Sequence, residues 1–226
     1  MKIGILGTGV VGQTLSAKLA SLGHAVMLGT RDVAQLMARP AGGMGESQPF
    51  AAWHEQNAGV MLGTFAQAAA HGEVLFNCTN GSGSLAALKL AGEGNLNGKV
   101  LVDVSNPLDF SQGFPPSLPV CNTDSLAEQI QRAFPQVKVV KSLNTMTAMV
   151  MVNPALVPGD HDVFVCGNDA GAKAAVAGML KDWFGWKSVI DLGDITAARG
   201  AEMILPIWVR LMGVLQTPLF NFKIAR

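Results

Sequence analysis

Short apolar runs alternate along this chain with longer segments in which apolar residues recur every three or four positions. The first run is Lys2–Leu6, and it ends at a glycine. The segment that follows has the spacing of one helical face, its apolar positions being Val11, Leu15, Leu19 and Leu22. A second apolar run follows at residues 25–28. This order of strand, glycine turn, helix and strand predicts the first half of a Rossmann unit.

The same alternation continues to the end of the chain. Further buried strands are predicted at residues 60–62, 74–76, 100–104, 137–140, 163–165 and 188–191. Helical spacing predicts helices at residues 65–71, 85–91, 124–134 and 170–183, and a final one from residue 196 to about 216 that Pro206 must kink or divide. We therefore expect an α/β fold: a Rossmann-type, doubly wound, mostly parallel sheet with a short C-terminal strand and helix extension.

Composition supports this fold class and excludes several partners. Hydrophobic residues make up 49% of the chain and charged residues 14%, so most strands need cover on both faces, as in a parallel sheet. The 16 basic and 16 acidic residues cancel without forming blocks, which argues against a nucleic-acid partner. The most apolar late stretch, residues 203–215, contains Pro206 and Arg210 and is too short to span a bilayer. We expect a cytoplasmic protein without membrane insertion and without a signal peptide.

Cysteines and histidines show no metal-binding spacing. The three cysteines are far apart, and neither they nor the four histidines form a CxxC pair or a metal-ligand pattern. We expect no metal site, and we interpret the cysteines as small apolar residues of the interior.

The chemistry is carried first by the glycine-rich turn after the first predicted strand. It reads Gly7, Thr8, Gly9, Val10, Val11 and Gly12, a GxGxxG motif between a strand and a helix. The first glycine permits the tight turn, the second lets a pyrophosphate approach the backbone, and the third lets helix and strand pack closely. The N-terminus of the helix offers free N–H groups to phosphate. This context predicts dinucleotide binding.

The end of the second strand distinguishes NADP from NAD. An NAD site usually has an acidic residue here to bind the ribose 2′-hydroxyl. In this chain Thr30 and Arg31 follow the strand, and a hydroxyl beside a guanidinium suits a 2′-phosphate. Asp32 is the counter-argument, because it could bind a ribose diol or simply cap the next helix. We favour NADP(H) as the cofactor.

Small polar residues follow three further predicted strands. They are Thr79 and Asn80, then Ser105, Asn106 and Pro107, and finally Asn144. In an open α/β sheet the ligand lies beyond the carboxyl ends of the strands, so these residues can face one crevice and bind ribose, nicotinamide or a second ring. Any one of them could equally be ordinary turn chemistry.

The sequence shows no acid–base constellation. None of the histidines is paired with a carboxylate, Asp103 falls inside a predicted strand where we expect it to hold a neighbouring loop, and the chain has no tyrosine. Reduction of a carbonyl normally needs a proton donor, whereas hydride transfer between two stacked rings needs orientation and exclusion of water. We therefore predict no catalytic side chain.

With these residues in view, the chain resembles the NADPH:deazaflavin oxidoreductase family, which depends on coenzyme F-420, and the related cytosolic domain of the six-transmembrane metalloreductases. The opening pattern lies in residues 3–9, 23–24 and 29–31. Residues 98–107, 139–145 and 165–167 are similar to the metalloreductase branch, and the similarity extends to the closing helix near Arg199. It thus covers nearly the whole chain.

The resemblance implies hydride transfer between NADP(H) and a deazaflavin or flavin stacked on its nicotinamide. It places the pyrophosphate on the glycine turn, the 2′-phosphate on Thr30 and Arg31, and the nicotinamide beside the polar strand ends after residues 78, 105 and 143. We expect a single domain, 1–226, with residues 1–145 as the NADP-binding core and residues 146–226 packed on it. Two departures leave the acceptor open: the metalloreductase membrane domain has no counterpart here, and residues 41–57 read as an insertion.

Two other functions stay open at this stage. One is an imine reductase resembling pyrroline-carboxylate reductase, although its long helical dimerisation region has no room after the strand near Val189. The other is a protein that senses NADP(H) without catalysis. The apolar stripe of the closing helix is compatible with a homodimer, although such a stripe more often packs within its own chain.

Overall fold

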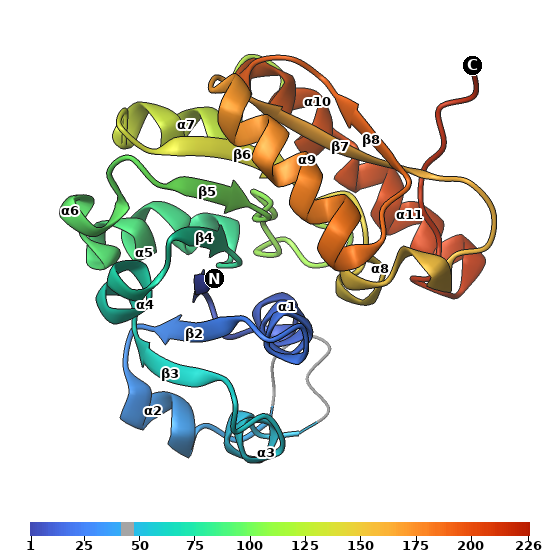
Figure 1. Ribbon diagram of the computed structural model, residues 1–226. Coiled ribbons are helices and arrows are strands. Elements are labelled where there is room, and N and C mark those ends of the chain that lie inside the picture. The colour runs from blue at the N-terminus through green and yellow to red at the C-terminus, as the bar shows by residue number, and fades with distance from the viewer. Residues whose placement is uncertain (42–47) are drawn as a thin grey trace.

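The computed structural model describes residues 1–41 and 48–226, and one twisted eight-stranded sheet runs through it (Figure 1). The strand order is β3-β2-β1-β4-β5-β6-β7-β8. The bounds are β1 Lys2–Leu6, β2 Ala25–Thr30, β3 Met61–Thr64, β4 Val74–Asn77, β5 Val100–Asp103, β6 Lys138–Ser142, β7 Asp162–Gly167 and β8 Ser188–Asp191. Every strand predicted from the apolar runs is present, within one to three residues at each end.

The first six strands are parallel, and the last two run the other way. β6 pairs with β7 in antiparallel register, Lys141 opposite Cys166, and β8 lies parallel to β7. β7 therefore starts at the edge of the sheet where β1 to β6 end. This confirms the expected doubly wound, mostly parallel sheet and shows that its C-terminal extension is an antiparallel one.

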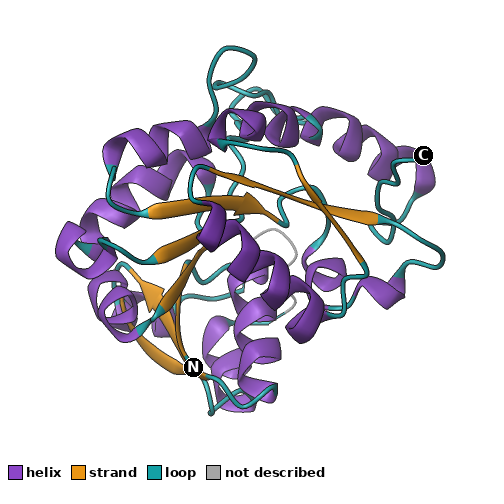
Figure 2. Cartoon of the chain, turned by 45° about the horizontal axis from the view of Figure 1, so that its top comes forward, coloured by secondary structure: helices purple, strands orange, loops and turns teal. Residues whose placement is uncertain are grey.

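Helices cover both faces of the sheet, as Figure 2 shows. On one face, α1 (Val10–Ser21), α8 (Ala148–Val152) and α9 (Ala170–Phe184) pack on the strands through residues such as Leu15, Val150 and Val176. The other face is covered by α4 (Phe65–His71), α5 (Ser84–Ala91), α6 (Glu93–Leu96), α7 (Leu126–Ala133) and α10 (Ala198–Met203). With both faces covered, all residues of β4 and β7 are buried.

Two short helices follow β2. They are α2 (Val33–Ala38), the helix that Asp32 was expected to cap, and α3 (Phe50–Gln56), which was not predicted. The second falls in the segment 41–57 that reads as an insertion. Residues 42–47 of that segment lie outside the described residues.

The predicted closing helix is two helices. α10 ends at Met203, and α11 (Leu205–Leu215) begins with Pro206 in its first turn, where a missing N–H costs nothing. Beyond α11 the chain returns to the start of β7, where the N–H of Asp162 donates to the carbonyl of Phe222 at 2.9 Å. Among the residues that the structure describes, no helix is long and apolar enough to cross a membrane.

Candidate active site

The glycine turn forms a tight link between β1 and α1. Gly7 has a φ of +116°, and a Cβ there would lie 2.6 Å from the carbonyl oxygen of Cys78. A Cβ on Gly12 would overlap the carbonyl oxygen of Gly7, so this glycine lets the helix pack against the turn. At Gly9 a Cβ would meet nothing within 4 Å. Gly9 is the N-cap of α1 and makes no side-chain cap, so the first N–H groups of the helix remain available to an anion.

A cavity of about 690 Å³ opens directly over this turn. Its lining comes from three segments: the glycine turn with Gly7, Thr8 and Gly9, the chain from Thr30 to Arg39, and the end of β4 with the start of α5. These three segments thus form a single hollow at the carboxyl ends of parallel strands, where α/β proteins bind ligands. Of the predicted site residues, Gly7, Thr8, Gly9, Thr30, Arg31, Thr79 and Asn80 line it.

The chain after β2 brings two arginines to the cavity. Thr30 is 9% exposed at the strand end, and Arg31 is exposed beside it. The carboxylate of Asp32 accepts from the N–H of Gln35 at 2.9 Å and caps α2, which favours the capping alternative over a ribose ligand. Arg39 follows α2 and lines the same cavity. It was missed in the sequence because α2 is too short to show helical spacing, and only that helix brings position 39 back toward position 31.

The loop after β4 is ordered by its own polar side chains. The hydroxyl of Thr79 donates to Asn77 Oδ1 at 2.7 Å and lies 2.8 Å from the hydroxyl of Ser84. Asn80 Oδ1 accepts from the N–H of Ser82 at 3.2 Å. Both predicted residues of this loop therefore line the cavity and also shape the turn that leads to α5.

The loops after β5 and β6 are clasped together. Asn106 Nδ2 donates to the carbonyl of Asn144 at 2.9 Å, and Asn144 Nδ2 donates to Asn106 Oδ1 at 2.9 Å and to the carbonyl of Ala201 at 2.9 Å. Asn144 is 2% exposed and Ser105 4%. Pro107 lines a second cavity of about 570 Å³, which shares Asn80 with the first. The predicted residues Val10, Val11, Gly12, Ser105, Asn106 and Asn144 do not line either cavity.

Beneath these loops lies a buried polar cluster that sequence reasoning did not assemble. We call Asn77, Asp103, Ser105, Lys141 and Glu202 the buried network. The ammonium of Lys141 lies 2.8 Å from Asp103 Oδ2 and 2.8 Å from Glu202 Oε1, and all three side chains are at most 1% exposed. Burial by itself lowers the pKa of Lys141, but the carboxylates of Asp103 and Glu202 outweigh it and raise that pKa above its ordinary value. Lys141 is therefore a charged structural centre and not a proton donor.

The expectation that the cysteines lie in the interior is wrong for Cys121, which is exposed on the loop before α7 and lines neither cavity. The other two thiols have raised pKa values, which disfavours the nucleophilic thiolate. Cys78 lines the larger cavity, but burial and the neighbouring Asp103 raise the pKa of its thiol. Burial likewise raises the pKa of Cys166 to about 12. In the described part of the chain, no group of three histidine, cysteine, aspartate or glutamate side chains could hold a metal ion.

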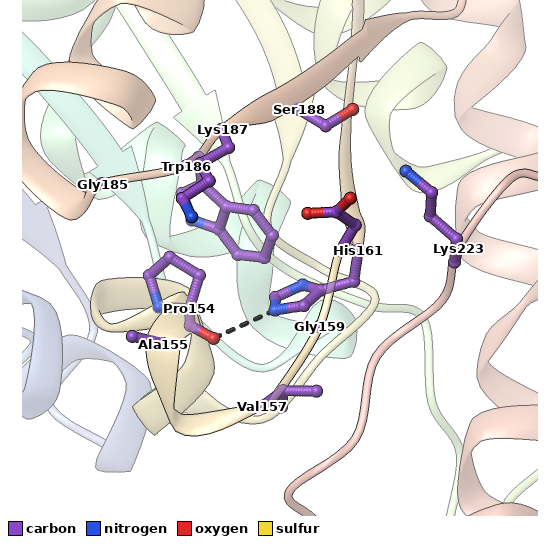
Figure 3. A pocket seen from close by; sticks show the side chains of 11 residues that line it. Pro154, Ala155, Val157, Gly159, His161, Gly185, Trp186, Lys187, Ser188 and Lys223 are labelled. Atoms are coloured by element: carbon purple, nitrogen blue, oxygen red, sulfur yellow. Dashed lines mark hydrogen bonds between the residues drawn. The ribbon is translucent and has the colours of Figure 1, made fainter.

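A third cavity, of about 320 Å³, lies near the start of β7 and is lined by Trp186, His161 and Lys223 (Figure 3). Its two aromatic side chains already have hydrogen-bond partners. His161 Nε2 donates to the carbonyl of Pro154 at 3.0 Å, and Nδ1 accepts from Asn221 at 2.9 Å. The indole N–H of Trp186 donates to the carbonyl of Met151. The bond between His161 and Asn221 holds the returning C-terminal segment against the start of β7.

A glycine turn with an uncapped helix start, under an open cavity with two arginines, defines a Rossmann-type dinucleotide-binding protein. Comparison with known proteins narrows the class. The family model described as NADP oxidoreductase coenzyme F420-dependent matches residues 2–107. The crystal structure of a presumed F420-dependent NADP reductase from Arthrobacter sp. FB24 is 57% identical, with both chains covered over 100% and a TM-score of 0.95. The chain belongs to this family of NADP-dependent oxidoreductases.

This chain covers a smaller share of its more distant relatives. Rat metalloreductase STEAP3 is 28% identical over 92% of this chain, and the F420-dependent NADP reductase of Methanocaldococcus jannaschii is 32% identical over 51% of it. The chain spans 38% and 52% of those two proteins. An imine reductase from Myxococcus stipitatus is 16% identical with a TM-score of 0.62, which shows a shared fold alone.

Proposed function

We propose that this protein transfers a hydride between NADP(H) and a deazaflavin or flavin ring stacked on the nicotinamide. The observation that carries the proposal is the chemistry of the two adjoining cavities. Among the described residues, neither cavity is lined by a histidine, lysine or tyrosine. Their carboxylates, Asp32 and Asp109, accept hydrogen bonds from nearby backbone N–H groups. Such a site can orient two rings but offers no general acid to a carbonyl or imine substrate.

The larger cavity fits the phosphate-bearing half of NADP(H). The glycine turn and the start of α1 would hold the pyrophosphate, since Gly9 leaves room for it. Thr30 and Arg31 would bind the 2′-phosphate, and Arg39 adds a second guanidinium to the same cavity. Thr79 and Asn80, where the larger cavity meets the second one, would contact the nicotinamide and its ribose. Bound NADPH supplies the hydride, and these residues supply its position.

We assign the nicotinamide to the sheet edge beyond β4, β5 and β6. Asn80 and Pro107 line the second cavity there, and the clasped loops of Asn106 and Asn144 form its support. Leu85, Leu108 and Phe110 give this cavity apolar walls. Flat apolar walls suit a ring acceptor and exclude water from the hydride. The F420 dependence in the relatives' names favours a deazaflavin as that acceptor.

The test is a binding titration followed by an acceptor panel. NADPH and NADH would be titrated by fluorescence, and NADPH oxidation would then be followed with F420, FMN, FAD and a cyclic imine. Tighter binding of NADPH with oxidation by one ring acceptor supports the proposal. Oxidation by the imine alone would favour the imine-reductase alternative. Tight binding without oxidation by any acceptor would favour a sensor of NADP(H).

A further inference from the structure

The buried network connects the C-terminal helices to the loops at the carboxyl edge of the sheet. It starts at Glu202 on α10. Glu202 Oε2 accepts from the N–H of Leu126 at 2.8 Å, and Oε1 accepts from the N–H of Ala127 at 3.2 Å, both at the N-terminus of α7. Oε1 also pairs with the ammonium of Lys141 in β6. One carboxylate thus ties α10, α7 and β6 together.

From Lys141 the contacts continue into the neighbouring strand ends. The ammonium donates to Asp103 Oδ2 at 2.8 Å and to the carbonyl of Ser105. Asp103 Oδ1 accepts from the hydroxyl of Ser105 at 2.6 Å and from Asn77 Nδ2 at 2.8 Å. Asp103 Oδ1 therefore joins the end of β4 to the start of the loop after β5, while Oδ2 ties both to Lys141 of β6.

The last link reaches the cavity itself. Asn77 Oδ1 accepts from the hydroxyl of Thr79, and Thr79 lines the larger cavity next to Asn80. A parallel tie joins the same elements, because Asn144 bonds both Asn106 and the carbonyl of Ala201 on α10. Ala201 and Glu202 thus hold the loop after β6 directly and the loop after β5 through one residue, Asn144 or Lys141. The loop after β4 is reached through Lys141, Asp103 and Asn77 in turn.

We propose that Lys141 and Glu202 are positioning residues that fix these three loops, and with them the nicotinamide end of the bound cofactor. The proposal rests on the proposed function only in placing the nicotinamide at this edge. The phosphate end of the site is made by the glycine turn and the chain from Thr30 to Arg39, and none of these residues belongs to the buried network. Disturbing the network should therefore loosen one end of the cofactor and leave the other end bound.

The experiment compares two nucleotides on the whole chain. Adenosine 2′,5′-bisphosphate carries the adenine and the 2′-phosphate but no nicotinamide, whereas NADPH carries both ends. In Glu202→Gln an amide replaces the carboxylate at the same size, and its N–H₂ must face either the Lys141 ammonium or the α7 N–H groups. We expect the Kd for NADPH to rise about tenfold, the scale of a misplaced reacting group. We expect the Kd for the bisphosphate to stay within about twofold, and the emission of bound NADPH to fall toward that of free NADPH.

Glu128→Gln is the matched control. Glu128 is also a buried carboxylate at the start of α7 and also pairs with a cation of α10, Arg199 Nε at 2.9 Å. In the described structure its side chain bonds to Ser125 and Arg199, which do not belong to the buried network. We expect both nucleotides to bind Glu128→Gln as they bind the unmodified protein. If both variants weaken NADPH binding equally, the proposal is overturned, because breaking any ion pair or hydrogen bond between α7 and α10 would then be enough to weaken it.

Asp103→Asn tests the same link from the other side of Lys141 and is used alongside Glu202→Gln. If these variants lose affinity equally for both nucleotides, or lose no affinity for NADPH, the network does not position the nicotinamide end. Failure of both variants to fold would overturn the proposal as well, since the network would then serve the whole fold. All readouts use binding alone. A failed acceptor panel would therefore count against the proposed function and leave this test intact.

Discussion

The two ends of the carboxyl edge of this sheet are built in opposite ways. At the phosphate end, residues 7–9 and the exposed Arg31 and Arg39 line an open cavity. At the other end, the buried network and the Asn106–Asn144 clasp join five elements, β4, β5, β6, α7 and α10, through side chains that are almost fully buried except for Asn106. The first end is assembled within about forty consecutive residues, whereas contacts of the second join residues up to 76 positions apart.

This difference separates binding from folding. An exposed cation contributes to a ligand's affinity and little to stability, because water solvates it when the ligand is absent. A buried ion pair has already lost its water, so removing one partner leaves an unpaired charge in a low dielectric. Substitutions of exposed side chains at the phosphate end should therefore change affinity alone, while substitutions in the buried network should change stability first. Five variants, besides their controls, test this comparison.

Lys141→Met should have the largest effect. It leaves Asp103 and Glu202 buried beside each other without their shared cation, so we expect the free energy of unfolding to fall by about 3–5 kcal/mol. Urea denaturation followed by circular dichroism measures it. Lys138→Met is the control, because Lys138 and its partner Asp169 have side chains 45% and 37% exposed, so the loss of this pair should cost at most about 1 kcal/mol. Equal losses in the two variants would remove the contrast between buried and exposed pairs.

Arg31→Ala should have the second-largest effect, and it should change nucleotide affinity but not stability. Loss of a charge-assisted hydrogen bond to the 2′-phosphate should weaken NADPH by about 1.5–3 kcal/mol, while NADH, which lacks that phosphate, should bind almost as before. Fluorescence titration gives both affinities, and a thermal melt should show an unchanged protein. Arg210→Ala, an exposed arginine of α11, is the matched control. If the affinities for NADPH and NADH fall equally, Arg31 supports the loop and does not bind the 2′-phosphate.

The glycine turn separates the two kinds of effect within one motif. In Gly12→Ala the new methyl group would overlap the carbonyl of Gly7, so stability should fall by about 1–3 kcal/mol. In Gly9→Ala the methyl group meets no protein atom within 4 Å, so stability should change by less than about 1 kcal/mol. Nucleotide affinity should nevertheless fall in Gly9→Ala, since the methyl group occupies the pyrophosphate's approach. Thermal melts and NADPH titrations of both variants measure the two effects. If Gly12→Ala were as stable as the unmodified protein, the packing role of Gly12 would be contradicted.

The phosphate end is also the part that could be predicted from the sequence. Its motif is local: glycines at fixed spacing between an apolar strand and a helical stripe place Gly7, Gly9 and Arg31 without any long-range information. Strand and helix positions followed from the same local periodicity, and β1, β8 and α4 have the predicted bounds. A helix after Asp32 was expected without bounds, and α3 was missed, because six or seven residues hold fewer than two full turns of any pattern.

The buried network could not be predicted in the same way. Asp103 was expected to hold a neighbouring loop, and it does accept from the N–H and hydroxyl of Ser105. Its partners Lys141 and Glu202 carry no local signal, because a lysine in an apolar strand and a glutamate in a closing helix look like ordinary solvated residues. The charges come together only because β5 pairs with β6, which places Asp103 opposite Lys141. Asn106 and Asn144 were predicted to line the crevice, and whether they contact the nicotinamide remains a prediction for the binding tests.

The smallest effect should come from an exposed ion pair at the start of α7, a few residues from the N–H groups that Glu202 binds. Arg132 lies 2.7 Å from Asp124 Oδ2, and its hydrogen bonds lower the pKa of Asp124 from 3.8 to about 2. A carboxyl whose pKa is lower in the folded state stabilises the protein above pH 3.8, and that contribution is lost as the pH falls through 2. Because water screens the pair, Asp124→Asn should cost at most about 1 kcal/mol at neutral pH and nothing near pH 2. Urea denaturation of both proteins between pH 2 and pH 6 measures the difference, and a loss as large as that of Lys141→Met would show that exposure does not divide the two kinds of pair.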